Sequence, residues 1–194
     1  MKRNLVYHSI FVHVFRWLSH LILFIARYKL VGELPKERRV VAIAAPHTSN
    51  WDFPVFITLV FLYRMEVRFL GKHTLFKGPM GYLMRWLGGM PVNRGTKDAS
   101  AVVSTAVKLF DEDDMVLGIA PEGTRSNVGK WKTGFYRIAV AADVPILLAY
   151  IDSKTRTVGL SHVFYPTGDM EADINKIKAF YADKTGIKPL NKGF

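Results

Sequence analysis

The chain has 194 residues, a length that suits one domain with a full hydrophobic core. Its 49% apolar content excludes a disordered chain, and its lack of cysteine excludes disulfides, a thiolate nucleophile and cysteine-ligated zinc. Lys and Arg total 27 against 16 Asp and Glu, so the formal charge of +11 favours a polyanionic partner, either nucleic acid or an anionic bilayer.

The amino-terminal segment favours the bilayer. Residues 4–28 are long enough to span a membrane, yet polar side chains recur along them at helical spacing. These polar residues are Ser9, His13, Arg16, His20 and Arg27. The pattern predicts an amphipathic helix in the membrane interface, with Phe15, Trp17 and Phe24 in the acyl region. The alternative is a core helix of the soluble domain. We therefore predict a membrane-associating helix over 1–28, followed by one domain over 29–194.

Strands and helices alternate along the rest of the chain. A short strand ending in a turn is predicted within 28–35, and further strands over 39–45, 66–71, 89–95, 115–120, 144–152 and 157–164. Helices are predicted over 51–64, 76–88, 96–110, 133–143 and 169–186. This order predicts an α/β fold with a mixed, largely parallel central sheet that is flanked by helices.

A histidine and an aspartate lie five residues apart in "APHTSNWDFP", residues 45–54. On a helix or a strand, His47 and Asp52 would point away from each other, so they meet only if the backbone changes conformation between them. The strand before them and the helix after them predict such a turn. A carboxylate sheltered by Trp51 and Phe53 would orient the imidazole and raise its basicity, which predicts a general base with its orienting partner.

The turn between the two residues carries helix-capping types, Thr48, Ser49 and Asn50. The plain alternative is a turn histidine bonded to backbone and an aspartate at the positive end of a helix. No G-x-S-x-G motif or cysteine supplies a side-chain nucleophile, so a substrate hydroxyl would have to be the nucleophile.

A second candidate site, "APEGTRSNVGKWKTGF" at 120–135, also follows a buried strand. Gly123 would let backbone amides approach a ligand, Thr124 offers a hydroxyl, and Arg125 offers a fork for phosphate. Glu122 could accept hydrogen bonds from a polyol or brace an arginine. Arg94 follows a third strand, so parallel strands would bring these groups to one edge of the sheet. The alternative is an ordinary polar loop.

Three further segments carry weaker signals. The loop with Lys72, His73 and Lys77 could touch a phosphate, but a solvated loop is the preferred interpretation. The acidic run at 111–114 is typical of a solvated turn, and no metal is assigned. Trp131, between two lysines, is predicted to anchor at the membrane interface rather than to stack on nucleic-acid bases.

The motifs together resemble a known family. The H-x-x-x-x-D of 47–52, the arginine of "VNR", "PEGTRS" at 121–126 and "VPI" at 144–146 stand in the order of the four motif blocks of the PlsC-type lysophosphatidic acid acyltransferases. The resemblance covers 41–152. This chain departs from the family pattern at Ala120, where the family usually has an aromatic residue, and it lacks the second proline of the last block.

The resemblance implies a glycerol-3-phosphate acyltransferase-like fold and an O-acyltransferase of phospholipid synthesis. His47 would deprotonate the hydroxyl of 1-acyl-sn-glycerol 3-phosphate, which attacks the thioester of acyl-ACP or acyl-CoA and yields phosphatidic acid without a cofactor. Backbone amides near the turn are expected to hold the oxyanion. Five residues are implied to hold the acceptor phosphate: Arg94, Glu122, Gly123, Thr124 and Arg125.

The expected partners are an anionic membrane surface, the acyl donor and a lysophospholipid acceptor, with no nucleic acid. The expected location is the cytoplasmic face of the inner membrane, monotopic or peripheral. The alternatives are the same chemistry on another lysophospholipid or an amino-lipid, a non-catalytic module that binds anionic membranes, and a nucleic-acid-binding protein, which charge alone supports.

Overall fold

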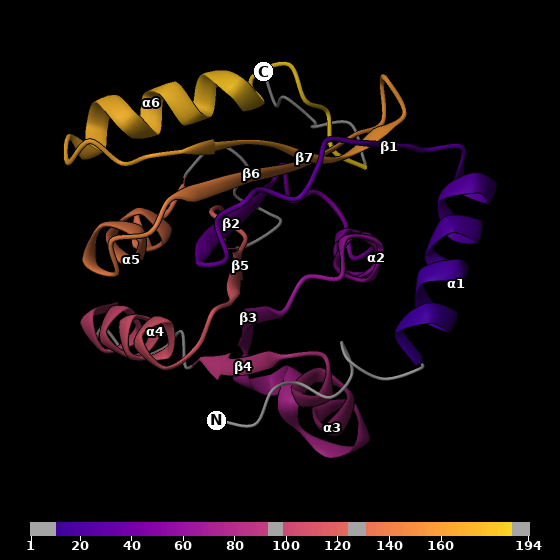
Figure 1. The fold of residues 1–194 in the computed structure, drawn as a ribbon, viewed down its shortest axis with the longest axis horizontal. Helices are drawn as coiled ribbons and strands as arrows, with labels where there is room; N and C mark the ends of the chain where they lie inside the picture. Colours follow the sequence, from indigo (N-terminus) through magenta and orange to yellow (C-terminus); the bar gives the residue numbers. More distant parts are fainter. Residues whose placement is uncertain (1–10, 93–98, 124–130, 188–194) are drawn as a thin grey trace.

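A seven-stranded mixed sheet organises the protein (Figure 1). The computed structural model describes residues 11–92, 99–123 and 131–187. The strands are β1 (Lys29–Val31), β2 (Val40–Ala45), β3 (Val67–Lys72), β4 (Gly89–Val92), β5 (Val116–Ile119), β6 (Ile146–Asp152) and β7 (Thr157–Phe164), in the spatial order β1-β7-β6-β2-β5-β3-β4. The five strands from β6 to β4 are parallel, whereas β7 runs antiparallel to β6 and pairs in parallel with β1. The predicted mixed, largely parallel sheet is confirmed.

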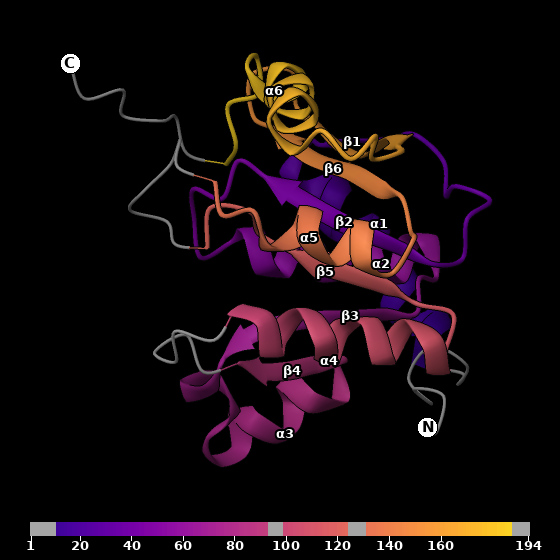
Figure 2. The same cartoon turned by 90° about the vertical axis from the view of Figure 1, so that its left-hand side faces the viewer.

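Helices cover both faces of the sheet (Figures 1 and 2). They are α1 (Phe11–Ala26), α2 (Asp52–Tyr63), α3 (Gly78–Trp86), α4 (Ala99–Glu112), α5 (Gly134–Ala141) and α6 (Met170–Tyr181), with a short 3₁₀ turn η2 (His73–Phe76) before α3. One hydrophobic core joins the sheet to α1, α2 and α3, and the other joins it to α4, α5 and α6.

The central strand shows why two cores form. In β2, Val40 and Ala42 belong to the core beneath α2, while Val41 and Ile43 belong to the core beneath α5. Successive side chains point to opposite faces, so a strand covered on both sides is a continuous apolar run. This is the pattern from which the strand was predicted.

Helix α1 packs on α2 rather than standing apart. The ring of Phe15 stacks on Phe61 with 4.8 Å between centroids. Phe15 therefore does not face outward, whereas the amphipathic pattern predicted that it would. Trp17 and Phe24 do lie on the exposed face. Part of the core-helix alternative is thus correct, because α1 buries one side and exposes another. Among the described helices, none is both long and apolar enough to cross a membrane.

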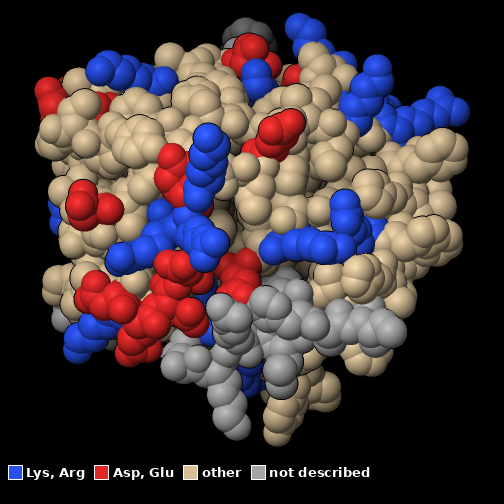
Figure 3. Space-filling model, in the orientation of Figure 1, with Lys and Arg blue, Asp and Glu red and all other residues tan. Residues whose placement is uncertain are grey.

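The acidic run at 111–114 covers the end of α4 and the residues after it, and it is largely solvent-exposed while forming two ion pairs. Arg39 and Asp111 form an ion pair of 3.8 Å, as do Arg38 and Asp114. Figure 3 shows the acidic residues gathered beside Lys and Arg at the lower left, over α4. No group of three metal-ligand side chains gathers anywhere in the described ranges.

Candidate active site

The parallel strands bring the sequence motifs to one edge of the sheet. Strand β2 ends at Ala45, two residues before His47, and its neighbour β5 ends at Ile119, three residues before Glu122. Because the two strands run in parallel, the loops that follow them leave the sheet on the same side. Helix α2 begins at Asp52, so the turn between β2 and α2 carries His47 back toward its partner.

The predicted pair of His47 and Asp52 is formed. His47 Nδ1 lies 2.9 Å from Asp52 Oδ2, and the backbone N–H groups of Thr48 and Ser49 donate to the same oxygen at 2.7 Å each. Donation from Nδ1–H leaves Nε2 as the nitrogen that accepts a proton. The amides of Thr48 and Ser49 stabilise the carboxylate charge that faces the imidazole.

The Asp52 carboxylate is shielded from solvent, but Trp51 does not shield it as predicted. Its side chain is 11% exposed, but Trp51 is 68% exposed and turned outward. Phe53 packs inward, against Phe69 at 5.2 Å. The helix start also differs from expectation, because Trp51 is the N-cap residue and makes no side-chain capping bond. Within the turn, the Ser49 hydroxyl accepts the backbone N–H of Trp51 at 3.2 Å, and the backbone amides of Thr48 and Ser49 donate to Asp52.

Glu122 bridges the two motifs. Its side-chain Oε2 accepts the backbone N–H of His47 at 2.8 Å, and the residue is 3% exposed. Burial raises the pKa of the Glu122 carboxyl, while the hydrogen bond from His47 opposes that rise. The sequence suggested a polyol or an arginine as its partner. Within the described part of the chain, the carboxylate holds the backbone N–H of His47.

A buried tyrosine supports the same edge of the sheet. Tyr181 donates from its hydroxyl to the carbonyls of Ile43 and Ala149, and Trp131 packs on its ring at 5.5 Å between centroids. Burial, and then the nearby Glu122 carboxylate, raises the pKa of Tyr181 well above its usual value. Trp131 is half-buried and packs inward, so its predicted role as a membrane anchor is wrong.

The segment after α6 returns to the turn that carries His47, which the sequence did not predict. Asp152, at the end of β6, accepts the Thr185 hydroxyl at 2.6 Å and the Thr155 hydroxyl at 2.7 Å. Gly186 pairs with β6 in an isolated bridge and lies against Thr48, where an added Cβ would be 2.8 Å from the Thr48 side chain.

A cavity of about 720 Å³ opens beside His47. It lies under α2, over a sheet face where the central strands carry Ala44, Gly118 and Ala149. These small side chains leave the space open, and a Cβ on Gly118 would be 2.9 Å from the Phe56 ring. The lining is mostly apolar, with the His47 and Asp52 side chains among its few polar groups. A cavity of this size and lining suits a ligand with a long apolar part.

The phosphate-binding prediction is only partly covered by the structure. Arg94, Thr124 and Arg125 lie outside the described residues. Gly123 lines the cavity and has a φ of +67°, a left-handed conformation that favours glycine. The backbone amides of residues 47–49 already donate to carboxylates, so these three amides are not the expected oxyanion donors.

The fold and the site together define an α/β protein with a histidine–aspartate pair at the mouth of an apolar cavity. The acyltransferase family model matches residues 27–152, well over half of the 194 residues, and the chain belongs to that family. The structure is similar to that of the 1-acyl-sn-glycerophosphate (LPA) acyltransferase PlsC from Thermotoga maritima, with a TM-score of 0.59, 20% identity and coverage of 87% of this chain and 76% of that chain. That likeness shows the fold.

Several named acyltransferases are similar in sequence. The 1-acyl-sn-glycerol-3-phosphate acyltransferase of Haemophilus influenzae is 25% identical over 76% of this chain and 63% of its own length. The Escherichia coli enzyme of the same name is 26% identical over 61% of this chain and 49% of its own length. The human enzyme named 1-acyl-sn-glycerol-3-phosphate acyltransferase beta is 27% identical over 72% and 51%. The chain thus spans about half to two thirds of these relatives.

Proposed function

We propose that the chain transfers a fatty acyl group from acyl-CoA or acyl-ACP to the hydroxyl of 1-acyl-sn-glycerol 3-phosphate, forming phosphatidic acid. The observation that carries this proposal is the 2.9 Å contact between His47 Nδ1 and Asp52 Oδ2 beside an apolar cavity. The shared name of the relatives supports the choice of acceptor.

The geometry provides a direct route for the transfer. His47 Nε2 removes the proton of the acceptor hydroxyl, and the oxygen attacks the thioester carbonyl carbon to form a tetrahedral oxyanion. The C–S bond then breaks, the ester remains, and the imidazolium returns its proton to the leaving thiolate. General-base assistance of this kind contributes about 10²- to 10⁴-fold in rate. No acyl-enzyme forms, in keeping with a nucleophile supplied by the substrate.

Two carboxylates hold the base in position, and two backbone amides support one of them. Asp52 fixes the ring through Nδ1, Glu122 fixes the backbone N–H, and Thr48 and Ser49 stabilise the Asp52 charge. We propose that the phosphate of the acceptor is bound by Arg94 with the loop of Gly123, Thr124 and Arg125, following the family motifs. The apolar cavity would take an acyl chain.

We further propose that the protein works at the cytoplasmic face of the inner membrane and binds it peripherally. The outward face of α1 supports this, because it exposes large apolar side chains: Phe11, Val14, Trp17, Ile22, Phe24 and Ile25. The formal charge of +11 favours an anionic leaflet and an acidic donor protein. Figure 3 shows mostly uncharged side chains, with some Lys and Arg, on the right-hand side where α1 lies.

The test is thiol release from acyl-CoA and from acyl-ACP by detergent-solubilised protein, with and without 1-acylglycerol 3-phosphate. We expect release that requires the acceptor and falls by at least about 10²-fold in His47→Ala. His162→Ala is the matched control, because His162 is an exposed histidine on β7 outside the cavity. Release that persists in folded His47→Ala would refute the assignment of the base.

A further inference from the structure

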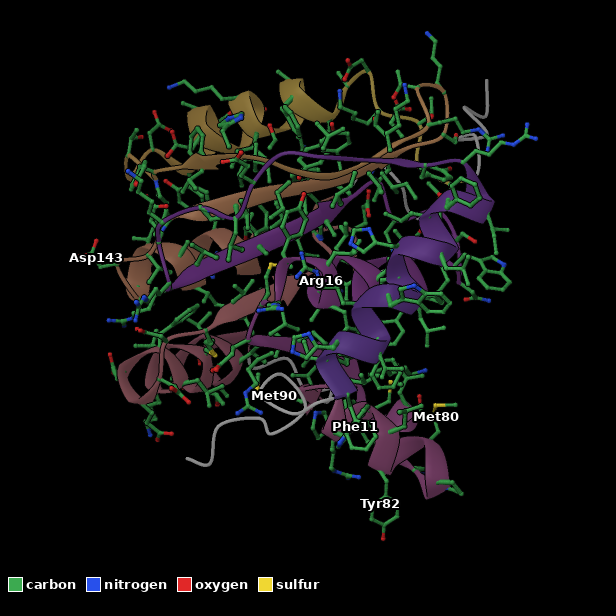
Figure 4. All side chains as sticks on the ribbon, turned by 45° about the vertical axis from the view of Figure 1, so that its right-hand side comes forward. Phe11, Arg16, Met80, Tyr82, Met90 and Asp143 are labelled. Atoms are coloured by element: carbon green, nitrogen blue, oxygen red, sulfur yellow. The ribbon has the colours of Figure 1, made fainter. Side chains whose placement is uncertain are left out.

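Helix α3 has an unusual outward face. In this nine-residue helix only Gly81 and Met84 are buried, and the exposed side chains include Met80, Tyr82, Leu83 and Trp86. The outward face of a surface helix is normally polar. Here Arg85 is its only charged residue. Tyr82 is 80% exposed, and Figure 4 shows it pointing away from the body of the protein.

This face lies next to helix α1. The rings of Phe15 on α1 and Trp86 on α3 are in edge contact, with 6.1 Å between centroids. In Figure 4, Phe11, the first residue of α1, and Met80 and Tyr82 of α3 appear on the same side of the molecule. Phe15 is half-buried, so this contact packs α1 against α3, and each of the two helices exposes apolar side chains of its own.

The same face reaches the cavity beside His47. Leu75 of η2 and Met80 of α3 both line the cavity, and both are about half exposed. The side chains at the mouth of the cavity are thus part of the exposed apolar surface. A ligand with a long apolar chain could pass from a layer covering this surface into the cavity without entering water.

The Lys, Arg, Asp and Glu side chains of this part of the chain have one sign. The chain holds no Asp or Glu between residues 67 and 92, and its Lys and Arg there are Arg68, Lys72, Lys77 and Arg85. Lys72, Lys77 and Arg85 are exposed. Apolar and aromatic side chains surrounded by cations are complementary to an anionic bilayer, which combines an apolar interior with negative headgroups.

We infer that η2 and α3 (residues 73–86) form a second contact with an anionic bilayer, next to α1 and placed at the mouth of the cavity. The inference extends the proposed function, because that function requires a lipid to reach His47. It also gives Lys72 and Lys77 a role at the headgroup level instead of in a plain solvated loop.

The test measures binding to sedimenting vesicles of phosphatidylglycerol and phosphatidylcholine. The variant Tyr82→Ser/Leu83→Ser changes two exposed α3 residues that do not line the cavity. We expect its partition onto the mixed vesicles to fall about tenfold, because two large side chains no longer insert. Leu34→Ser/Val140→Ser is the matched control, since both residues are exposed elsewhere, and it should bind like the wild type. Circular dichroism should show unchanged folding in both variants.

A third variant, Phe24→Ser/Ile25→Ser, distinguishes the contribution of α1 to binding from that of α3, because it tests the α1 contact of the proposed function. Unchanged binding of the α3 variant, beside a loss in the α1 variant, would leave α1 as the sole contact and overturn the inference. If the wild type binds pure phosphatidylcholine vesicles as well as the mixed vesicles, the inferred preference for an anionic bilayer would be overturned. If the wild type is a dimer in solution and the α3 variant is a monomer, the face would instead be a contact with a second copy of the chain. Vesicle binding is independent of turnover, so the result stands even if no acyl transfer is found.

Discussion

At the residue scale, two carboxylates from different parts of the chain control one histidine. Asp52 accepts from the His47 ring and Glu122 accepts from its backbone N–H. The two contacts have different consequences. The contact with Asp52 determines which ring nitrogen of His47 accepts a proton, and the contact with Glu122 fixes the position of the His47 backbone. Loss of the Glu122 contact should therefore disturb catalysis without removing the base.

Glu122→Ala is expected to lower kcat by about 10- to 100-fold with little change in the KM of the acceptor, because a misplaced base reacts less well. Glu122→Gln should recover part of the rate, since its amide oxygen can still accept the N–H of His47. Steady-state kinetics with the acceptor varied would measure both. A large rise in acceptor KM with unchanged kcat would instead support the phosphate-holding role that the family motif implies.

At the scale of elements, the segment after α6 ties the end of β6 to the turn of His47. Thr185 is bonded to Asp152, and the next residue, Gly186, lies against Thr48. Thr48 in turn donates its N–H to Asp52. A change in this segment is therefore expected to reach the site through packing rather than through contact with substrate.

Gly186→Ala should lower turnover by displacing Thr48, in addition to the loss of stability that comes from the strained backbone. Gly186 has a φ of +68°, and an added Cβ would be 2.8 Å from the Thr48 side chain, which must then shift. Gly78→Ala is the matched control, because Gly78 has a φ of +57° and nothing within 4 Å. Both variants should lose about 1–2 kcal/mol of stability in chemical denaturation. Equal activity in the two would show that Gly186 does not act on the turn.

The acid stability of the protein should depend on Asp152. Burial acts to raise its pKa, but hydrogen bonds from Thr185, Thr155 and Lys154 outweigh burial and lower the pKa to about 2 from 3.8. The stabilisation is then complete above pH 3.8 and is lost as the pH falls toward about 2.

Asp152→Asn should therefore cost about 2 kcal/mol in the free energy of unfolding at neutral pH, and this difference should shrink toward pH 2. Denaturant titrations at several pH values would measure it. The exposed Asp143, seen at the edge of the molecule in Figure 4, gives the control Asp143→Asn. A constant difference across the acid range would mean that Asp152 does not titrate as its hydrogen bonds imply.

At the scale of the whole molecule, the cavity runs beneath α2 from side chains at the surface to a buried wall. Leu75 and Met80 lie at its exposed end, whereas Val158 on β7 lines it and is fully buried. A chain that enters past Leu75 would extend toward Val158, so the buried wall is expected to limit its length.

Val158→Phe is expected to shift donor preference toward shorter acyl chains, lowering kcat/KM for long donors about tenfold relative to short ones. A panel of acyl-CoA donors of increasing length would measure the shift. Val140→Phe, which enlarges an exposed side chain on α5 outside the cavity, should leave the profile unchanged. An unaltered profile in folded Val158→Phe would place the acyl chain elsewhere.

The sequence by itself determined the kinds of element, their order and the meeting of His47 with Asp52. Each of these depends on neighbours in the chain: apolar runs mark the strands, helical spacing marks the helices, and a strand-to-helix turn brings residues five apart together. The PlsC-type motifs led to the family that the acyltransferase model confirms. Only the tertiary structure decided that β7 is antiparallel to β6, that Glu122 binds the backbone of His47, and that Trp131 packs on Tyr181. Contacts of this kind join residues far apart in the chain, 75 positions for His47 and Glu122 and 138 for Ile43 and Tyr181, and they depend on which strands are neighbours in the sheet. A local pattern of polar and apolar residues does not encode that order, because the same strands would be equally apolar beside other neighbours.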